Sequence, residues 1–123
     1  MIEPLFLLDS NICIYVLADA DSSAARRLGM AKPGEVVTSM IAYAEVLRGL
    51  NTTISAEALF AVVPPLPFDR RAAEAYTRLP FKRARFDRLI AAHALSLSLT
   101  LVTNNAGAFA DIPGLKIENW AAA

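Results

Sequence analysis

The residues whose types could do chemistry together are four polar side chains spread along the chain: Asp9, Glu45, Asp87 and Asn105. Three carboxylates that converge within a few ångströms repel one another by roughly 4 kcal/mol per pair at an effective dielectric constant of about 20. Such a cluster calls for a cation. Oxygen ligands, with no Cys or His pattern nearby, favour Mg²⁺ or Mn²⁺ over Zn²⁺.

The chemistry that fits so sparse a set of ligands is phosphodiester hydrolysis. Mg²⁺ keeps several water molecules, and in proteins it uses one or two carboxylates together with the phosphates of a substrate. One metal ion or two could then activate an attacking water and stabilise the leaving oxygen. The residues alone leave the number of ions open.

Two predicted strands place the first and last of these residues at one edge of a sheet. The apolar run Pro4–Leu8 stops at Asp9, and the run Leu99–Val102 is followed closely by Asn105. Short apolar runs of this kind are typical of buried parallel strands. Because ligands bind outside the carboxyl ends of parallel strands, this edge is the expected site.

Two predicted helices bring the other two acids to that edge. Asp87 precedes the helical stretch Arg88–Leu97, and a helix that runs antiparallel to the strand after it begins at that strand's carboxyl end. Glu45 lies on a helix predicted over Met40–Gly49, with Ser39 as its N-cap. It joins the site if the first turns of that helix lie against the same edge.

Each of these residues also has an ordinary structural explanation. Asp9 could be a turn or cap residue, and Glu45 could form a helix ion pair with Arg48. Asp87 could be only a favourable charge at a helix N-terminus, and Asn105 could be a helix cap. The hypothesis of a metal site therefore depends on all four residues and their compatible topology.

The rest of the chain alternates between short strands and helices, which indicates an α/β fold with a parallel sheet. We expect strands at Val36–Thr38 and Leu115–Ile117, and a proline-rich edge strand of the sheet at Val62–Leu66. Further helices are predicted over Ile12–Ala18 with Ser10 or Asn11 as its cap, Ser22–Met30, Ser55–Ala61, Arg70–Arg78 with Asp69 as its cap, and a last turn at Ala106–Phe109. Trp120 is expected to pack the C-terminus against the body.

Size and composition favour one domain over residues 1–123. A chain of 123 residues with 55% hydrophobic content can bury a substantial core, and its single cysteine, Cys13, is expected to be a small buried residue. We find no apolar run long enough for a bilayer and no signal peptide, so we expect a cytoplasmic protein. The mean hydropathy of +0.41 suggests apolar surface that a partner or second copy covers.

Twelve basic and twelve acidic residues cancel, so binding to a nucleic acid would need a local patch. The candidate patch surrounds Asp87, is flanked by Phe81 and Phe86, and consists of Lys82, Arg83, Arg85 and Arg88. It would offer phosphate-binding charge and rings for base stacking. Alternatively, the segment is a solvated link whose phenylalanines anchor it in the core.

Five short motifs occur in an order that is specific as a set: Leu7–Asn11, Ser39 with Ala44–Val46, Asp87–Ala94, Leu101–Asn105, and Pro113–Leu115 through Glu118–Trp120. With them, nearly the whole chain resembles PIN-domain ribonucleases, and among these the VapC-type toxins of type II toxin–antitoxin pairs. The resemblance implies a PIN fold, with a central parallel sheet of about four to five strands flanked by helices.

The resemblance also implies roles for individual residues. Asp9, Glu45 and Asp87 would be the metal ligands, and Asn105 stands where many members carry a fourth acid. Ser39 and Thr103 match positions where the family keeps a hydroxyl near the site, and Asn11 matches a polar loop residue. The implied reaction is endonucleolytic RNA cleavage by a metal-activated water, with Mg²⁺ or Mn²⁺ as cofactor. The implied state is a homodimer held inactive by a cognate antitoxin.

The chain departs from the family pattern in two places. Asn105 is neutral, so a second metal ion would be held more weakly. The segment between the helix at Arg70–Arg78 and Asp87 is short and lacks the usual glycine, which puts the shape of a substrate groove in question. Both departures leave the acids in place.

Other classes fit less well. A haloacid-dehalogenase-like phosphatase needs a second Asp two residues after the first, where this chain has Asn11, and the paired acids and late lysine of a receiver domain are missing. A PIN-like module that binds RNA or protein without catalysis is the main alternative. Such a module would have no reason to keep mutually repelling acids. His93 is interpreted as structural, because a metal-activated water needs no imidazole base.

Overall fold

A parallel sheet is the centre of the fold. The computed structural model describes residues 2–49, 54–80 and 86–121. Within them, five strands form one sheet in the order β3-β2-β1-β4-β5, and every neighbouring pair is parallel. The strands are β1 (Phe6–Leu8), β2 (Val36–Ser39), β3 (Pro65–Leu66), β4 (Thr100–Val102) and β5 (Ile117–Glu118).

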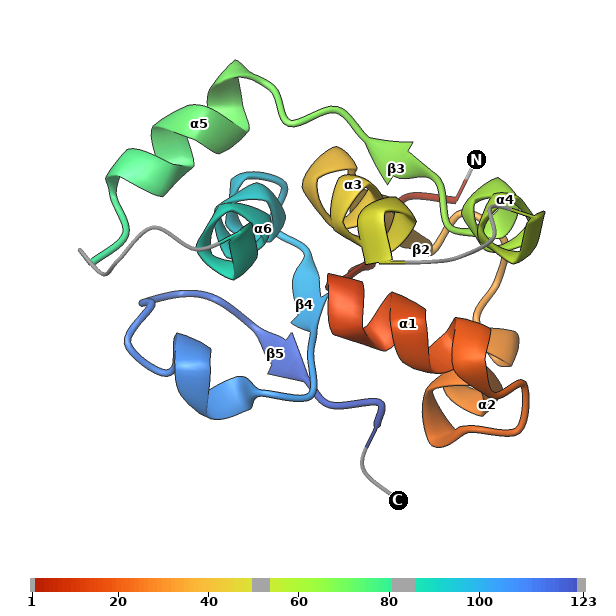
Figure 1. Cartoon of the computed structure of the whole chain (residues 1–123). Coiled ribbons are helices and arrows are strands. Elements are labelled where there is room, and N and C mark those ends of the chain that lie inside the picture. The colour runs from red at the N-terminus through yellow and green to blue at the C-terminus, as the bar shows by residue number, and fades with distance from the viewer. Residues whose placement is uncertain (1, 50–53, 81–85, 122–123) are drawn as a thin grey trace.

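Helices cover both faces of the sheet (Figure 1). The helices α1, α2 and α4 pack on one face, while α6 and the short 3₁₀ helix η1 pack on the other, with α5 against α6. Their bounds are α1 (Ser10–Ala18), α2 (Ser23–Gly29), α3 (Met40–Gly49), α4 (Ile54–Val62), α5 (Arg70–Thr77), α6 (Phe86–Ser96) and η1 (Ala106–Phe109). The arrangement is a three-layer α/β fold, as expected from the alternation of elements.

The sheet separates two apolar cores. Successive residues of a strand point to opposite faces, so the buried side chains of Leu7 and Leu8 contribute to different cores. The same alternation divides Leu101 from Val102 in β4. Strands buried on both faces require continuous apolar runs, and this is why these segments read as uniformly hydrophobic.

Strand order puts a switch point between β1 and β4. From β1 the chain proceeds to β2 and β3 on one side, then returns to form β4 and β5 on the other. The backbone N–H of Asp9 donates to the Val102 carbonyl at 3.0 Å, so the carboxyl ends of β1 and β4 are adjacent. A crevice outside this point is where open α/β sheets bind ligands.

Several predicted boundaries shift by a few residues. The helix α1 begins at Ser10, and Asp9 is its N-cap, so the assignment of the cap to Ser10 or Asn11 was wrong. Val62 belongs to α4, which leaves only Pro65–Leu66 as the edge strand. The last strand is Ile117–Glu118 instead of Leu115–Ile117.

Other local predictions are confirmed. Asp69 caps α5 through its side chain, as predicted. Ser22, predicted as the first residue of a helix, is the N-cap of α2. Cys13 is completely buried, and Trp120 is 4% exposed, with its ring 5.1 Å from that of Phe6 and under the Arg27 guanidinium. Among the described residues, none of the helices combines the length and hydrophobicity that a membrane span requires.

Candidate active site at the carboxyl ends of β1 and β4

Asp9 is held by donors from three residues. Its Oδ1 atom accepts the Ile12 N–H at 2.9 Å, and its carboxylate also interacts with the Thr103 hydroxyl and the Asn11 backbone N–H. The side chain is only 6% exposed. It therefore caps α1 and lies in a fixed orientation at the switch point, since the helix N-terminus favours an anion.

The loop after β4 supports Asp9 through Thr103. The Thr103 Oγ1 atom also accepts the backbone N–H of Asn105 at 3.1 Å, so one hydroxyl connects the two residues predicted at this edge. The Asn105 side chain is exposed and makes no cap bond to η1. Its neighbour Asn104 turns back to α1, where its amide donates to the Tyr15 hydroxyl at 2.7 Å.

Glu45 reaches the same edge from α3. Its Oε1 atom accepts the Ser10 hydroxyl at 3.1 Å, and Ser10 is the first residue of α1. Sequence reasoning considered Ser10 only as a helix cap, although its position directly after Asp9 was the available signal for a role at the site. The bond joins residues 35 positions apart and ties α3 to the start of α1.

Asp87 lies in the first turn of α6 and is half-buried. Its Oδ1 atom is buried and has no hydrogen-bond partner among the residues that the structure describes. Buried carboxylate oxygens are normally paired, so an orphaned one indicates a missing ligand or water. A bound cation is one ligand that would pair with this oxygen.

Electrostatics couple the three acids. Burial is the main cause that raises the pKa of Asp9, and repulsion from Asp87 adds to it. Burial also raises the pKa of Glu45, with contributions from both Asp87 and Asp9. Asp87 therefore lies close enough to Asp9 and Glu45 to disfavour the charged forms of these two acids.

The donor set fits Mg²⁺ or Mn²⁺ better than Zn²⁺. The acids offer oxygen atoms, and the one histidine of the chain, His93, is buried and bonded to Ser39 instead. Within the described residues, no three Asp, Glu, His or Cys side chains form a ready-made ligand cluster. Mg²⁺ needs only one or two carboxylates beside its waters, so this arrangement is compatible with it.

Ser39 supports the site indirectly. Its Oγ atom accepts the Ile41 N–H at 3.1 Å and lies 2.9 Å from Nδ1 of His93. Because the oxygen already accepts one bond, we assign its proton to the bond with Nδ1 of a neutral ring. Burial lowers the pKa of His93, which agrees with this neutral form. The pair pins α6 to the start of α3, and His93 is structural, as interpreted from the sequence.

Arg88 does not belong to the basic patch. Its side chain is buried and forms a two-bond ion pair with Asp111, at 3.0 and 2.8 Å, so the prediction that it binds RNA was wrong. A guanidinium with these bonds is not available to a phosphate. Asp111 lies 23 residues away, and nothing in the local sequence indicated it.

The rest of the predicted patch is only partly tested. Lys82, Arg83 and Arg85 lie outside the described residues, as does Phe81. Phe86 is 57% exposed, so it does not anchor the segment in the core. The side chain of Asn11 is exposed in the first turn of α1, and its backbone contributes to holding Asp9.

Comparison with known proteins agrees with this geometry. The family model of the PIN domain matches residues 6–115. The chain belongs to the PIN-domain family. The PIN domain described here is 30% identical to the tRNA(fMet)-specific endonuclease VapC of Shigella flexneri, over 94% of this chain and 97% of that protein. It is 29% identical to ribonuclease VapC2 of Rickettsia felis, over 94% and 98%.

Solved structures that resemble this PIN domain include toxin–antitoxin complexes of other proteins. VapBC2 from Rickettsia felis bound to a promoter DNA fragment matches with a TM-score of 0.84 and 26% identity, covering 94% of this chain and 98% of that one. DNA-bound VapBC from Salmonella typhimurium matches with a TM-score of 0.81 and 26% identity, covering 95% and 98%. The predicted family and the five-stranded fold are thereby confirmed.

Proposed function

We propose that this PIN domain is a metal-dependent endoribonuclease and the toxin of a toxin–antitoxin pair. The observation that carries the proposal is the position of three acids near the switch point: Asp9 caps α1, Glu45 is bonded to the first residue of α1, and one Asp87 oxygen has no partner among the described residues. The names of the relatives, which are ribonucleases, support the choice of RNA as substrate. We take residues 1–123 as a single domain acting in the cytoplasm.

In this proposal Asp9 and Asp87 are the main metal ligands, with Glu45 as a third. A bound Mg²⁺ or Mn²⁺ would supply activation of water and stabilisation of the leaving oxygen. Asp9 presents its carboxylate in one orientation because Thr103 and the first turn of α1 hold it. Glu45 is oriented by Ser10. Such preorganised groups need little rearrangement during the reaction.

Other residues have supporting roles in the proposal. Thr103 orients Asp9, and Ser39 fixes the start of α3 through His93. Asn105, exposed at the same edge, would be a weak ligand for a second ion. The side chain of Asn11 faces solvent and is available to substrate. We assign phosphate contacts to Lys82, Arg83 and Arg85.

The proposed partners are a cognate antitoxin and a second copy of the chain. The solved relatives are VapBC complexes, which supports the antitoxin. Exposed apolar side chains, among them Met30 at 77% and Val62 at 62%, give surface of the kind that a partner covers. Size-exclusion chromatography with light scattering, with and without the gene product encoded next to this chain, tests both partners.

RNA cleavage by the purified chain tests the function directly. An end-labelled single-stranded RNA is incubated with Mg²⁺, with Mn²⁺ or with EDTA, using wild type, Asp9→Ala and Asp87→Ala. We expect internal cuts only with metal and only in wild type. Cleavage in EDTA, or in both variants, would contradict the mechanism. RNA binding without cleavage would favour the catalytically silent binding module instead.

A further inference from the structure

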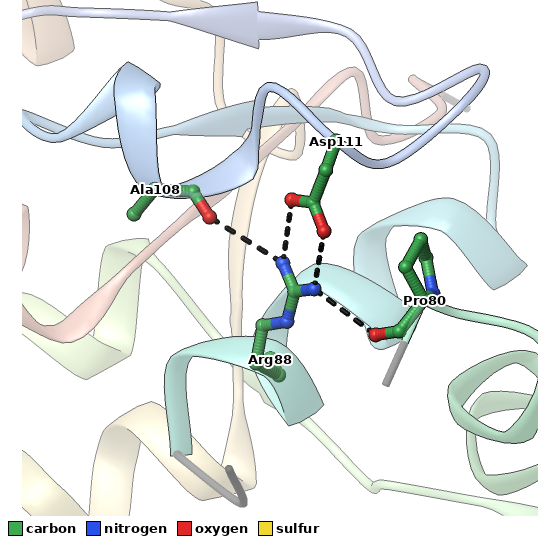
Figure 2. Close-up of polar contacts among 4 residues, drawn as sticks. All are labelled: Pro80, Arg88, Ala108 and Asp111. Atoms are coloured by element: carbon green, nitrogen blue, oxygen red, sulfur yellow. Dashed lines mark hydrogen bonds and ion pairs between the residues drawn. The ribbon is translucent and has the colours of Figure 1, made fainter. Parts of the chain in front are cut away.

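Arg88 is the most extensively bonded side chain near the site, yet the proposed reaction gives it no role. Figure 2 shows its guanidinium between Asp111, Ala108 and Pro80. The Nη1 atom donates to Asp111 Oδ1 at 3.0 Å and to the Ala108 carbonyl at 3.3 Å. The Nη2 atom donates to Asp111 Oδ2 at 2.8 Å and to the Pro80 carbonyl at 3.2 Å.

These bonds join three segments that carry or flank the proposed site. Arg88 stands in the first turn of α6, directly after Asp87. Ala108 and Asp111 belong to η1 and the turn after it, in the connection that begins with the Thr103–Asn105 loop. Pro80 lies in the connection between α5 and α6. The planar fork of an arginine fixes all of these in direction as well as distance.

Asp87 differs from the other acids in how it is held. Asp9 accepts bonds from named donors, and Glu45 accepts one from Ser10. The Asp87 Oδ1 atom has no partner among the described residues. Since no donor from the described residues holds this oxygen, we infer that its place depends on the backbone that carries it, the first turn of α6.

We propose that Arg88 and Asp111 form a positioning pair that fixes the first turn of α6 and thereby places Asp87 at the metal site. Arg88 and Asp111 are in contact although they lie 23 positions apart in the sequence, and Arg88 is only 4% exposed. This inference rests on the proposed function. Arg88 touches neither substrate nor metal in it, and its effect passes through Asp87.

A pair that only stabilises the fold is the competing explanation. Both explanations predict some loss of stability when the pair is broken. Only positioning predicts that turnover and metal binding fail while the chain stays folded. Asp111→Asn suits this test, because the side chains have the same shape and that of Asp111 is 30% exposed, so the variant is expected to fold.

The experiment compares wild type with Asp111→Asn and Arg88→Lys, and uses Glu74→Gln as the matched control. Glu74 forms an exposed ion pair with Arg70, at 3.7 Å on α5, so the control also removes one ion pair. Circular dichroism sets an assay temperature at which every chain is folded. The measurements are kcat and KM for RNA cleavage and the affinity for Mn²⁺ by titration calorimetry.

Positioning predicts that Asp111→Asn lowers kcat by about 10- to 100-fold with little change in KM, because displacement of a reacting group by an ångström has effects of this size. Mn²⁺ affinity falls in parallel. Arg88→Lys shows the same losses, since lysine keeps the positive charge but lacks the planar guanidinium that makes two bonds to Asp111. Glu74→Gln behaves as wild type. Unchanged kcat and Mn²⁺ affinity in folded Asp111→Asn would overturn the inference.

A separate measurement distinguishes failure of this inference from failure of the proposed function. If wild type binds no Mn²⁺ or cleaves no RNA, the proposed function is contradicted, but the positioning of Asp87 by Arg88 and Asp111 is not. The amide resonance of Asp87 in ¹H–¹⁵N spectra then tests the positioning of Asp87 independently of activity. A shift in Asp111→Asn that is absent in Glu74→Gln supports positioning, and an unchanged Asp87 resonance contradicts it.

Discussion

At the scale of single residues, Asp9 combines two roles that usually occur apart. It caps α1 and is also the most buried of the three acids. Asn is as good an N-cap as Asp, but it carries no charge for a cation. A change to Asn therefore separates the structural role from the chemical one.

We expect Asp9→Asn to abolish metal-dependent cleavage while the fold keeps or gains stability. Loss of the charge removes its burial cost and its repulsion with Asp87, and the Ile12 N–H still has an acceptor. We expect kcat/KM to fall at least ~100-fold, a size typical of lost electrostatic groups. Cleavage assays and thermal melts measure the two effects.

The matched control is Asp69→Asn, which changes the N-cap of α5 in the same way. Because Asp69 is exposed and outside the proposed site, activity and stability should both stay near wild type. Equal losses of activity in the two variants would show that capping, and not metal binding, explains the effect at Asp9.

The raised pKa of Asp9 predicts a dependence of stability on pH. A folded-state pKa above the ordinary value of 3.8 means that the folded state holds the proton more tightly. The contribution of Asp9 to stability therefore falls as pH rises from that value through the folded pKa. Asp9→Asn should stabilise the chain progressively more over this window and by a constant amount above it.

Urea unfolding of both chains in EDTA, at a series of pH values from acid to neutral, measures this difference. EDTA is included because a bound cation would offset the cost of burying the Asp9 charge, which is the quantity that the experiment measures. A free-energy difference that stays flat, or shrinks as pH rises, would mean that the Asp9 carboxyl is not destabilised in its charged form.

Residue types and spacing predict Asp9, Glu45 and Asp87 as a set, since each stands next to a recognisable strand or helix, and their role as metal ligands stays a prediction. Arg88 was misjudged because a basic residue between basic neighbours looks like surface charge. Its burial depends on Asp111, and a contact between positions so far apart has no local signal. Ser10 was missed as the partner of Glu45 for the same reason.

At the scale of elements, the contact of Ser39 with His93 fixes the position of α6 relative to the start of α3. The two helices carry Glu45 and Asp87, so their relative placement decides how the acids converge. Phe68 packs edge-on against the His93 ring, with centroids 5.6 Å apart. The buried histidine is thus enclosed by both polar and apolar neighbours.

We expect Ser39→Ala to lower the free energy of unfolding by about 1–3 kcal/mol, because it leaves Nδ1 of His93 and the Ile41 N–H without their partner. Ser96→Ala is the control. Its hydroxyl bonds a helix carbonyl on α6, and we expect its loss to cost under ~0.5 kcal/mol. Urea melts measure both, and equal effects would contradict the role given to Ser39.

The type and order of the elements could be predicted from periodicity and turn residues, and element ends could not. Capping depends on which oxygen reaches which N–H, so Asp9 took the place expected for Ser10 or Asn11. The run Val62–Leu66 was read as one strand, because proline and valine suit an extended edge. Val62, which is 62% exposed, instead belongs to α4, a helix that packs on the core through Leu59 and Phe60.

At the scale of the whole molecule, the parallel sheet collects residues from the full length of the chain. The switch point between β1 and β4 lies where the N-terminal and C-terminal halves meet. Topology therefore brought Asp9 and Asp87 together, as expected from the direction of α6. The sheet was predictable because the segments around β1 and β4 are mainly apolar and strands alternate with helices along the chain. The family was predictable from five short motifs.

Metal binding should stabilise the whole chain. Mn²⁺ relieves the repulsion among the acids, and at about 100 times its Kd a ligand adds ~2.7 kcal/mol to the unfolding free energy. We expect the melting midpoint to rise by several degrees with Mn²⁺ in wild type. The double variant Asp9→Asn with Asp87→Asn should show no such shift, and an equal shift would place the ion elsewhere.

The rate of RNA cleavage as a function of free Mn²⁺ tests most directly whether the three acids form a metal-dependent site for this reaction. Single-turnover rates on one RNA strand, and on the DNA strand of the same sequence, are compared for wild type and Asp87→Asn. We expect a rate that rises and saturates with Mn²⁺ for RNA in wild type, and is at least ~100-fold lower in the variant. A rate that is independent of Mn²⁺, or equal in the variant, would contradict such a site.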